Sequence, residues 1–290
     1  MPGDFSADGI GRAVLDFSRA LALSDDVCLT LGWPGESPPG VFWHGYDADL
    51  REVTYLLDLR LCALTEQLAA SLPALSRAQR ILAQHHLAFR DFCAAMAGVT
   101  EDEFDRTPAP NEWSLREIVH HVANAEMGFS LLIGWAVDRQ RSGEQLPIRM
   151  PREEMEPHYA TVTPEGALDQ VLGRYERQHG RIQRDLADLR DADLEAPNVW
   201  WEEYEIPAWF RLHRLAEHLR EHTIQVEKTR LMLGCPPTES QRLARLLHRS
   251  LAALESVLLA APALEDARLD ELAAAFNAAT ETLAVLTENV

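Results

Sequence analysis

Two histidines one helical turn apart, and a third in an earlier segment, are the residues of this sequence best suited to chemistry. His218 and His222 have the i, i+4 spacing that places two side chains on one face of a helix. At about 100° per residue, they lie beside the apolar positions of the same segment. On the wheel of its own segment, His121 also falls on the flank of the apolar stripe, whereas His120 and His213 point away from theirs.

Three neutral imidazoles that meet inside a protein can bind one divalent metal ion and leave a coordination position for water or a substrate. Such an open site is typical of catalytic rather than structural metal centres. The spacing alone also fits histidines that face a polar pocket or lie solvated at helix edges. Both interpretations stay open on this evidence.

The elements that must position these residues are helices. Apolar residues recur every three or four positions and strand-like alternation is scarce, which predicts an all-α protein. Ser114 and Glu117 have the spacing of a capping box, which marks a helix start. Four amphipathic helices of one bundle are expected, at about 78–98, 114–139, 163–189 and 207–234. The proline-rich segment 142–163 is expected to lack a regular helix.

Two segments around the three histidines resemble the DinB-like (DinB/YfiT) family of four-helix bundles. The first reads WSLREIVHH from Trp113 to His121, and the second reads HLREHTIQ from His218 to Gln225. In that family, one histidine of the first motif and both histidines of the second bind one divalent metal ion. The resemblance therefore implies His121, His218 and His222 as ligands, and it covers about residues 76–234.

Members of the family that this sequence resembles include transferases and isomerases that use low-molecular-weight thiols, and iron-dependent sulfoxide synthases of the ergothioneine type. The iron enzymes commonly extend the second motif to H-x-x-x-H-x-E, whereas Thr223 and Ile224 follow His222 here. The resemblance thus implies zinc or nickel rather than iron as the cofactor, and a low-molecular-weight thiol as a cosubstrate.

Glu126 and Gln225 are the polar residues best placed to support these ligands. Glu126 falls within the apolar arc of its helix, where an unpaired carboxylate is costly. It either accepts a hydrogen bond from a metal-bound imidazole or pairs with an Arg or a Trp N–H elsewhere in the core. Gln225 lies near His218 on the wheel and can hydrogen-bond a ligand or a bound water, although a packing amide is the simpler interpretation.

Two more histidines and a group of aromatic residues complete the candidate site. His85 and His179 lie on apolar stripes, where each is either a further ligand or a core histidine satisfied by a neighbouring acid or carbonyl. Four aromatic residues lie just before or at the start of the last bundle helix, namely Trp200, Trp201, Tyr204 and Trp209. They suit the wall of a pocket for an organic substrate, and they equally suit a cap on the core.

The composition limits the partners and the location. The chain has 27 Lys and Arg against 46 Asp and Glu, and its net charge of -19 disfavours nucleic acid and anionic membranes as partners. No signal-peptide pattern and no apolar run of roughly 20 residues is found, which predicts a cytoplasmic protein. The four cysteines form no CxxC pair, so neither a disulfide scaffold nor a zinc–thiolate site is indicated.

Three domains are expected: a partly helical N-terminal extension (1–75), the bundle with the metal site (76–234) and a C-terminal helical hairpin (235–290). The hairpin either packs on the bundle or mediates a homodimer. The sequence predicts a divalent-metal-binding protein, with an S-transferase or hydrolase that activates a thiol or water for attack on a small electrophile as the leading hypothesis. The alternative is a non-enzymatic helical bundle that binds a small molecule or a protein partner.

Overall fold

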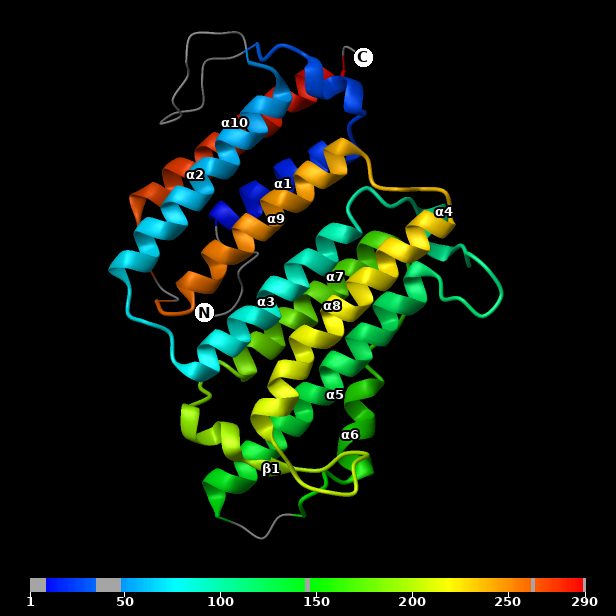
Figure 1. Cartoon of the computed structure of the whole chain (residues 1–290), viewed down its shortest axis with the longest axis vertical. Coiled ribbons are helices and arrows are strands. Elements are labelled where there is room, and N and C mark those ends of the chain that lie inside the picture. Colours follow the sequence, from blue (N-terminus) through cyan, green and yellow to red (C-terminus); the bar gives the residue numbers. More distant parts are fainter. Residues whose placement is uncertain (1–8, 35–47, 144–146, 262–263, 289–290) are drawn as a thin grey trace.

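The computed structural model of the chain describes residues 9–34, 48–143, 147–261 and 264–288. This part of the chain consists almost entirely of α-helices, which confirms the all-α prediction (Figure 1). Eight long helices form two groups of four, and the groups lie side by side (Figure 1). We call them the central bundle and the outer bundle.

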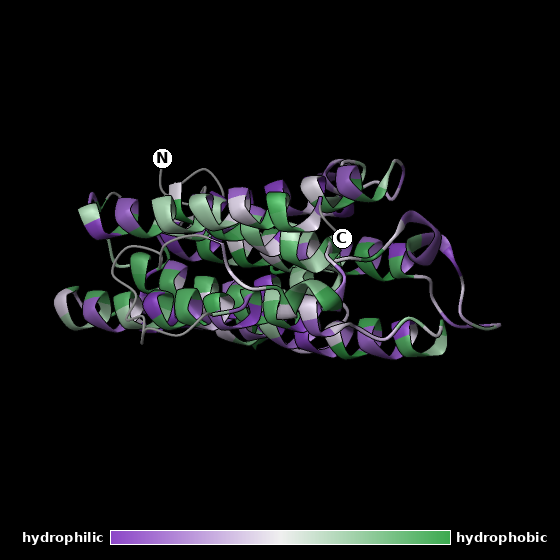
Figure 2. Ribbon diagram, turned by 90° about the horizontal axis from the view of Figure 1, so that it is seen from above, coloured by the Kyte–Doolittle hydropathy of each residue, from purple (hydrophilic) through white to green (hydrophobic). Residues whose placement is uncertain are grey.

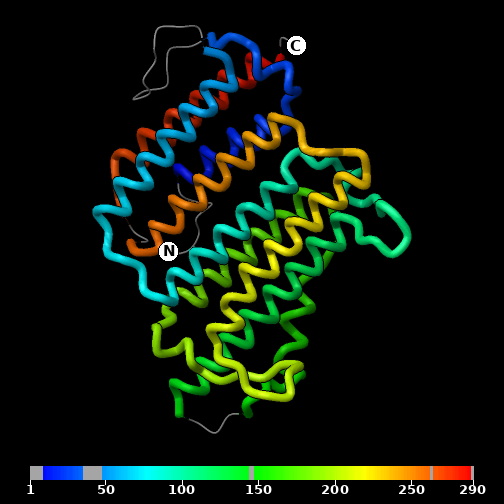
Figure 3. The backbone as a smooth tube through the Cα atoms, viewed as in Figure 1, coloured from blue at the N-terminus to red at the C-terminus, as the bar shows by residue number. Residues whose placement is uncertain are grey.

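The central bundle contains the four helices that the motifs require. They are α3 (Arg77–Ala95), α5 (Leu115–Ser142), α7 (Leu168–Asp185) and α8 (Ala208–Met232). Contacts of α3 with α7 and α8, and of α5 with the same two helices, close the ring. The tube in Figure 3 shows these helices running next to one another, although they are far apart in the sequence.

Capping explains where several of these helices begin. The α5 helix starts with the expected capping box, in which Ser114 accepts from the Glu117 backbone N–H and the Glu117 carboxylate accepts from the Ser114 backbone N–H. Ser76 and Gln79 form the same motif at the start of α3. Pro207 precedes α8, where its missing N–H is not needed.

Two expectations about the middle of the chain were wrong. The third bundle helix begins at Leu168 rather than at Thr163, because Gly166 has a φ of +102°, a left-handed conformation that interrupts the helix. The proline-rich segment does contain a helix, α6 (Arg152–Tyr159). It is short enough that Pro151 lies before its first turn and Pro157 lies near its end, where a missing N–H removes little hydrogen bonding.

Short elements connect the bundle helices. They are α4 (Glu101–Asp105), the 3-10 helix η2 (Asp191–Glu195) and the two antiparallel strands β1 (Pro197–Asn198) and β2 (Ile206–Pro207). The strand pair holds together the ends of the Trp-rich loop, residues 199–205, directly before α8. This loop therefore lies at one end of the central bundle (Figure 1).

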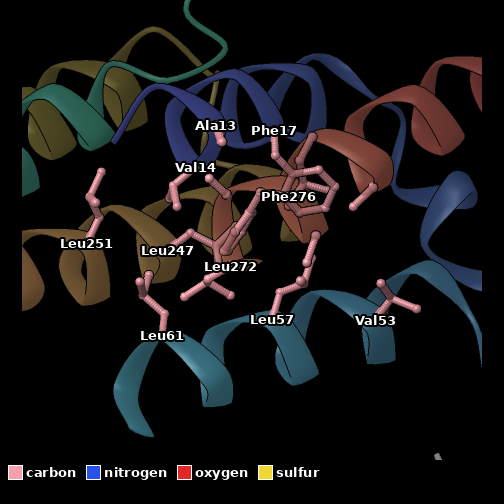
Figure 4. Close-up of a cluster of buried hydrophobic side chains, with 14 of the residues drawn as sticks. Ala13, Val14, Phe17, Val53, Leu57, Leu61, Leu247, Leu251, Leu272 and Phe276 are labelled. Carbon is pink, nitrogen blue, oxygen red and sulfur yellow. The ribbon is translucent and has the colours of Figure 1, made fainter. Parts of the chain in front are cut away.

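The two ends of the chain share one core, the outer bundle. It is built from α1 (Gly9–Leu23), α2 (Leu50–Ser71), α9 (Glu239–Leu258) and α10 (Ala267–Thr287), with the 3-10 helix η1 (Asp26–Thr30) beside them. Figure 4 shows how Phe17, Leu57, Leu247 and Phe276 point into this core from all four helices. The segments expected as an extension and a hairpin thus bury their apolar faces against each other.

The bundles meet where α9 packs against α3, so α3 has neighbours on both sides. Seen from above, the helices form layers, and each helix carries both hydrophobic and hydrophilic residues, as amphipathic helices do (Figure 2). Among the helices of the described residues, none combines the length and the apolarity needed to cross a bilayer.

A polar layer divides the core of the central bundle. One apolar cluster includes Phe89 and Val122, and a second includes Ile81 and Ile133. Between the two clusters lie buried polar side chains from three helices: His85 and His86 on α3, Glu126 on α5, and Gln178, His179 and Gln183 on α7. We call these six residues the polar layer.

Candidate metal centre

The three histidines of the two motifs converge between α5 and α8. The Nε2 atom of His218 lies 3.1 Å from Nε2 of His121 and 3.1 Å from Nε2 of His222. Two ligands of one ion, bound at roughly 2.0–2.1 Å, lie about 3 Å apart, so these nitrogen positions fit a shared ion. The three residues thus form a group that can hold a metal, and we call them the histidine triad.

Gln225 controls the orientation of one of these rings. Its Oε1 atom lies 2.6 Å from Nδ1 of His222. An amide oxygen accepts a hydrogen bond, so it keeps the proton of the neutral ring on Nδ1 and leaves a lone pair on Nε2. That lone pair points toward the other two histidines, which is the tautomer that metal binding needs.

The surroundings favour the neutral form of two rings of the triad. Burial lowers the pKa of His218 to about 3, and the nearby His222 and His121 add to the effect. Burial also lowers the pKa of His121, again with a contribution from His222. Because a protonated imidazole cannot bind a metal, neutral rings at pH 7 are the required state.

Aromatic rings enclose the triad on two sides. Trp113, the first residue of the first motif, lies parallel to His222, with the ring centroids 6.2 Å apart, and contacts His121 at 4.8 Å. Phe129 on α5 meets His218 edge-on at 5.9 Å. Sequence reasoning quoted Trp113 only as part of a motif and missed Phe129 as a site residue, although both lie in or near the first motif.

The Trp-rich loop extends this aromatic wall. Phe129 contacts the rings of both Trp200 and Trp201, at 5.8 and 6.4 Å between centroids. Gly128 allows the approach, because a Cβ atom there would collide with Trp200 and Tyr159. These contacts place the two tryptophans beyond Phe129 as seen from His218.

A buried arginine that sequence reasoning did not single out anchors the loop. Arg211 on α8 is fully buried, and it donates to Oδ1 of Asn198 at 2.9 Å and to Oε2 of Glu202 at 2.6 Å. Its guanidinium also lies 4.7 Å from the ring centroid of Trp201. Its position on the apolar face of α8 was the available signal, since an arginine there needs partners.

Other candidates lie away from the triad. Tyr204 is 69% exposed, and Trp209 packs against the second apolar cluster and contacts His213 on the outer side of α8. The aromatic residues that reach the triad region are therefore Trp200 and Trp201. His120 is also outside the triad, because its Nε2 contacts the Asn124 side chain at 2.8 Å.

Glu126 belongs to the polar layer and not to the triad. Its Oε1 atom lies 2.6 Å from Nε2 of His85 and 2.7 Å from Nδ1 of His179. Neither option considered for Glu126 is what the structure shows, because its partners are imidazoles from α3 and α7 that do not belong to the triad. His85 and His179 are accordingly core histidines with an acid beside them.

The polar layer continues into the outer bundle through His86. Nδ1 of His86 lies 3.1 Å from Nε2 of His179, and its Nε2 lies 2.7 Å from Oε2 of Glu255 on α9. Arg90 completes the connection with a bidentate pair to Glu255, at 3.0 and 2.7 Å. Burial lowers the pKa of His86, and burial lowers the pKa of His179 to about 3.

The fold and the site together define an all-α helical bundle in which three inward-facing histidines form a group that can hold a metal. Residues 84–226 match the family model of the DinB superfamily, and this range contains all three triad histidines. This part of the chain therefore belongs to the DinB superfamily. The chain matches no curated protein and no solved structure significantly.

Proposed function

We propose that the protein is a metal-dependent enzyme in which His121, His218 and His222 hold a divalent ion, with zinc or nickel as the best candidates. The observation that carries this proposal is the position of Nε2 of His218, which lies 3.1 Å from Nε2 of both His121 and His222, while Gln225 contacts the other nitrogen of His222. A bound divalent ion would lower the pKa of a thiol or water that it coordinates.

Aromatic residues of the chain shield the triad and offer a binding surface for an organic substrate. Trp113 and Phe129 cover the rings of the triad and keep water away from those sides. Trp200 and Trp201, anchored by Arg211, offer flat apolar surfaces against which an organic group can stack. This arrangement supports attack by a small thiol or water on a small electrophile, as in the thiol-dependent transferases that the motifs resemble.

Metal occupancy per chain tests the ligand assignment directly. We expect His218→Ala and His222→Ala each to lower metal affinity at the triad by at least tenfold, because each removes one of three ligands. The matched control is His213→Ala on the same helix, whose side chain contacts Trp209 on the outer side. An equal loss of metal in all three variants, measured by elemental mass spectrometry, contradicts the assignment.

A screen with low-molecular-weight thiols and small electrophiles then tests the reaction. We expect turnover by the metal-loaded protein and loss of turnover in His218→Ala. Metal binding without turnover of any thiol or ester supports the alternative, a bundle that binds a small molecule or protein partner without catalysis.

A further inference from the structure

The polar layer holds a second set of metal-ligating atoms, separate from the triad. His85, Glu126 and His179 come from α3, α5 and α7, and one ligand atom from each lies within 4.8 Å of the others. The three residues are 0%, 3% and 2% exposed. Two imidazoles and one carboxylate are a ligand set that binds first-row divalent ions.

Atoms of this layer lack aligned hydrogen bonds among the described residues. Oε2 of Glu126 and Nε2 of His85 are buried without an aligned hydrogen bond, although Nε2 of His85 is in short contact with Glu126 and the hydroxyl of the neighbouring Tyr175 interacts with the same carboxylate. Buried polar atoms are nearly always satisfied in native proteins. Two poorly satisfied atoms at one buried carboxylate therefore indicate that a further partner belongs there.

Proton counting gives the same result. Three contacts run in series, from Glu126 to His179 at 2.7 Å, from His179 to His86 at 3.1 Å and from His86 to Glu255 at 2.7 Å. Each contact needs one proton, but two neutral imidazoles carry only two. In one of the three contacts, two lone pairs therefore face each other with no proton between them, unless a cation is supplied.

The need for a cation lies at the Glu126 end of the series. At the other end of the series, Arg90 already neutralises Glu255 with a bidentate ion pair. Among the ion pairs of the described residues, Glu126 has only imidazole partners. If Glu255 accepts from Nε2 of His86, and His86 accepts from Nε2 of His179, the free lone pair is on Nδ1 of His179, facing Glu126.

His85 can present a lone pair in the same direction. Its Nδ1 atom lies 3.0 Å from the side-chain amide of Gln183, whose Oε1 atom has no partner among the described residues. The two ends of an amide have nearly the same shape, so a flipped amide accepts from Nδ1 of His85. The proton then stays on Nδ1, and Nε2 is free to bind a cation.

We propose that His85, Glu126 and His179 bind a second divalent transition-metal ion, which links α3, α5 and α7 from inside the central bundle. The contacts of 2.6 and 2.7 Å to Oε1 are shorter than the roughly 3 Å between two ligands of one ion. Binding therefore requires the carboxylate to rotate, which brings its second oxygen, Oε2, forward. Because the site is closed to solvent, this ion is structural and takes no substrate.

Metal stoichiometry tests this proposal, which does not depend on the triad's function. The probe is zinc alone, supplied during expression, with loosely bound metal removed by gel filtration. We expect two zinc ions per wild-type chain and one in the double variant His218→Ala, His222→Ala. The conservative variant Glu126→Gln should also keep one ion, in this case the one at the triad.

A second measurement makes the result independent of how well the Glu126 variant folds. In the double variant, the remaining buried ion should resist a chelator in the native state and leave only on unfolding. Refolding that variant with the chelator should lower its melting temperature by several degrees. One zinc ion in the wild type and none in the double variant would overturn the proposal. In that case a protonated imidazole supplies the proton that the series from Glu126 to Glu255 lacks.

Discussion

At the scale of single residues, the chemistry of this protein depends on the position of protons. The proposed metal binding by the triad requires neutral rings, and it requires the proton of His222 to be on Nδ1, the nitrogen that faces Gln225. Glu126 shows the opposite situation, since one of its oxygens is shared by two imidazoles and the other makes no aligned hydrogen bond among the described residues. We therefore expect changes in these hydrogen bonds to alter metal affinity.

Gln225 offers a test of this point. We expect Gln225→Leu to weaken metal binding at the triad by about 10- to 100-fold, because Nδ1 of His222 loses its acceptor. Gln225→Glu keeps an acceptor of the same length and should bind at least as tightly as the wild type. Titration with zinc against a competing chelator measures both, and equal affinities in the Leu variant and the wild type would show that Gln225 is only a packing amide.

At the scale of elements, α3 is the helix that connects the two bundles. It supplies His85 and His86 to the polar layer, and it packs against α7 and α8 on one side and α9 on the other. The contact with α9 contains the buried pair of Arg90 and Glu255. Such a pair contributes to the stability of the folded state mainly because the loss of one partner leaves the other charge buried and unpaired.

Glu255→Gln should therefore lower the free energy of unfolding at pH 7 by about 3 to 5 kcal/mol. As a control, Glu239→Gln changes an exposed partner of Arg51 on the same helix and should cost far less. Urea unfolding of both variants measures the difference. Similar losses in the two variants would mean that burial of the pair does not matter.

The same pair predicts a pH dependence with a definite sign. Burial acts to raise the pKa of Glu255, but Arg90 and His86 outweigh it and lower the pKa to about 2. The folded state thus binds fewer protons than the unfolded state between the ordinary carboxylate range and pH 2. The contribution is complete above about pH 4.5 and is lost as the pH falls toward 2, so the gap between the wild type and Glu255→Gln should shrink over that range.

At the scale of the whole molecule, two bundles with separate apolar cores share one contact surface. The outer bundle has a continuous apolar core in which Phe17 and Phe276 meet edge-on at 5.8 Å. The central bundle accepts a polar layer in the middle of its core. We therefore expect the outer bundle to stabilise the contact with α3, and the proposed metal binding to depend on the central bundle.

Phe276→Ala tests this division. Removing a fully buried ring from the outer core should cost about 3 to 5 kcal/mol of stability. The amount of metal bound per folded chain should not change, because the residues of the triad and of the polar layer belong to α3, α5, α7 and α8, whereas Phe276 lies in the core of the outer bundle. Denaturant unfolding and elemental analysis of the same preparation measure both quantities, and a loss of metal at full folding would show that the two cores are not separate.

The sequence alone determined the class of fold, the four helices of the central bundle and the triad. These follow from local rules, since helical periodicity, the capping box at Ser114 and the spacing of His218 and His222 act within a few turns of one helix. The hydrogen bond of Gln225 to His222 is local as well, because the two residues are three positions apart on one helix. The start of α7 was misplaced because a positive φ at Gly166 is not encoded in periodicity.

Only the tertiary structure decided the partners of Glu126, the role of His86 and the shared core of the two chain ends. Each of these depends on contacts between helices that are far apart in the sequence, such as His86 with Glu255 on α9. A helical wheel shows that a side chain points inward, but it does not show which helix it meets there. Long-range packing supplies that information, because the position of a partner is set by how the apolar faces of all eight long helices fit together.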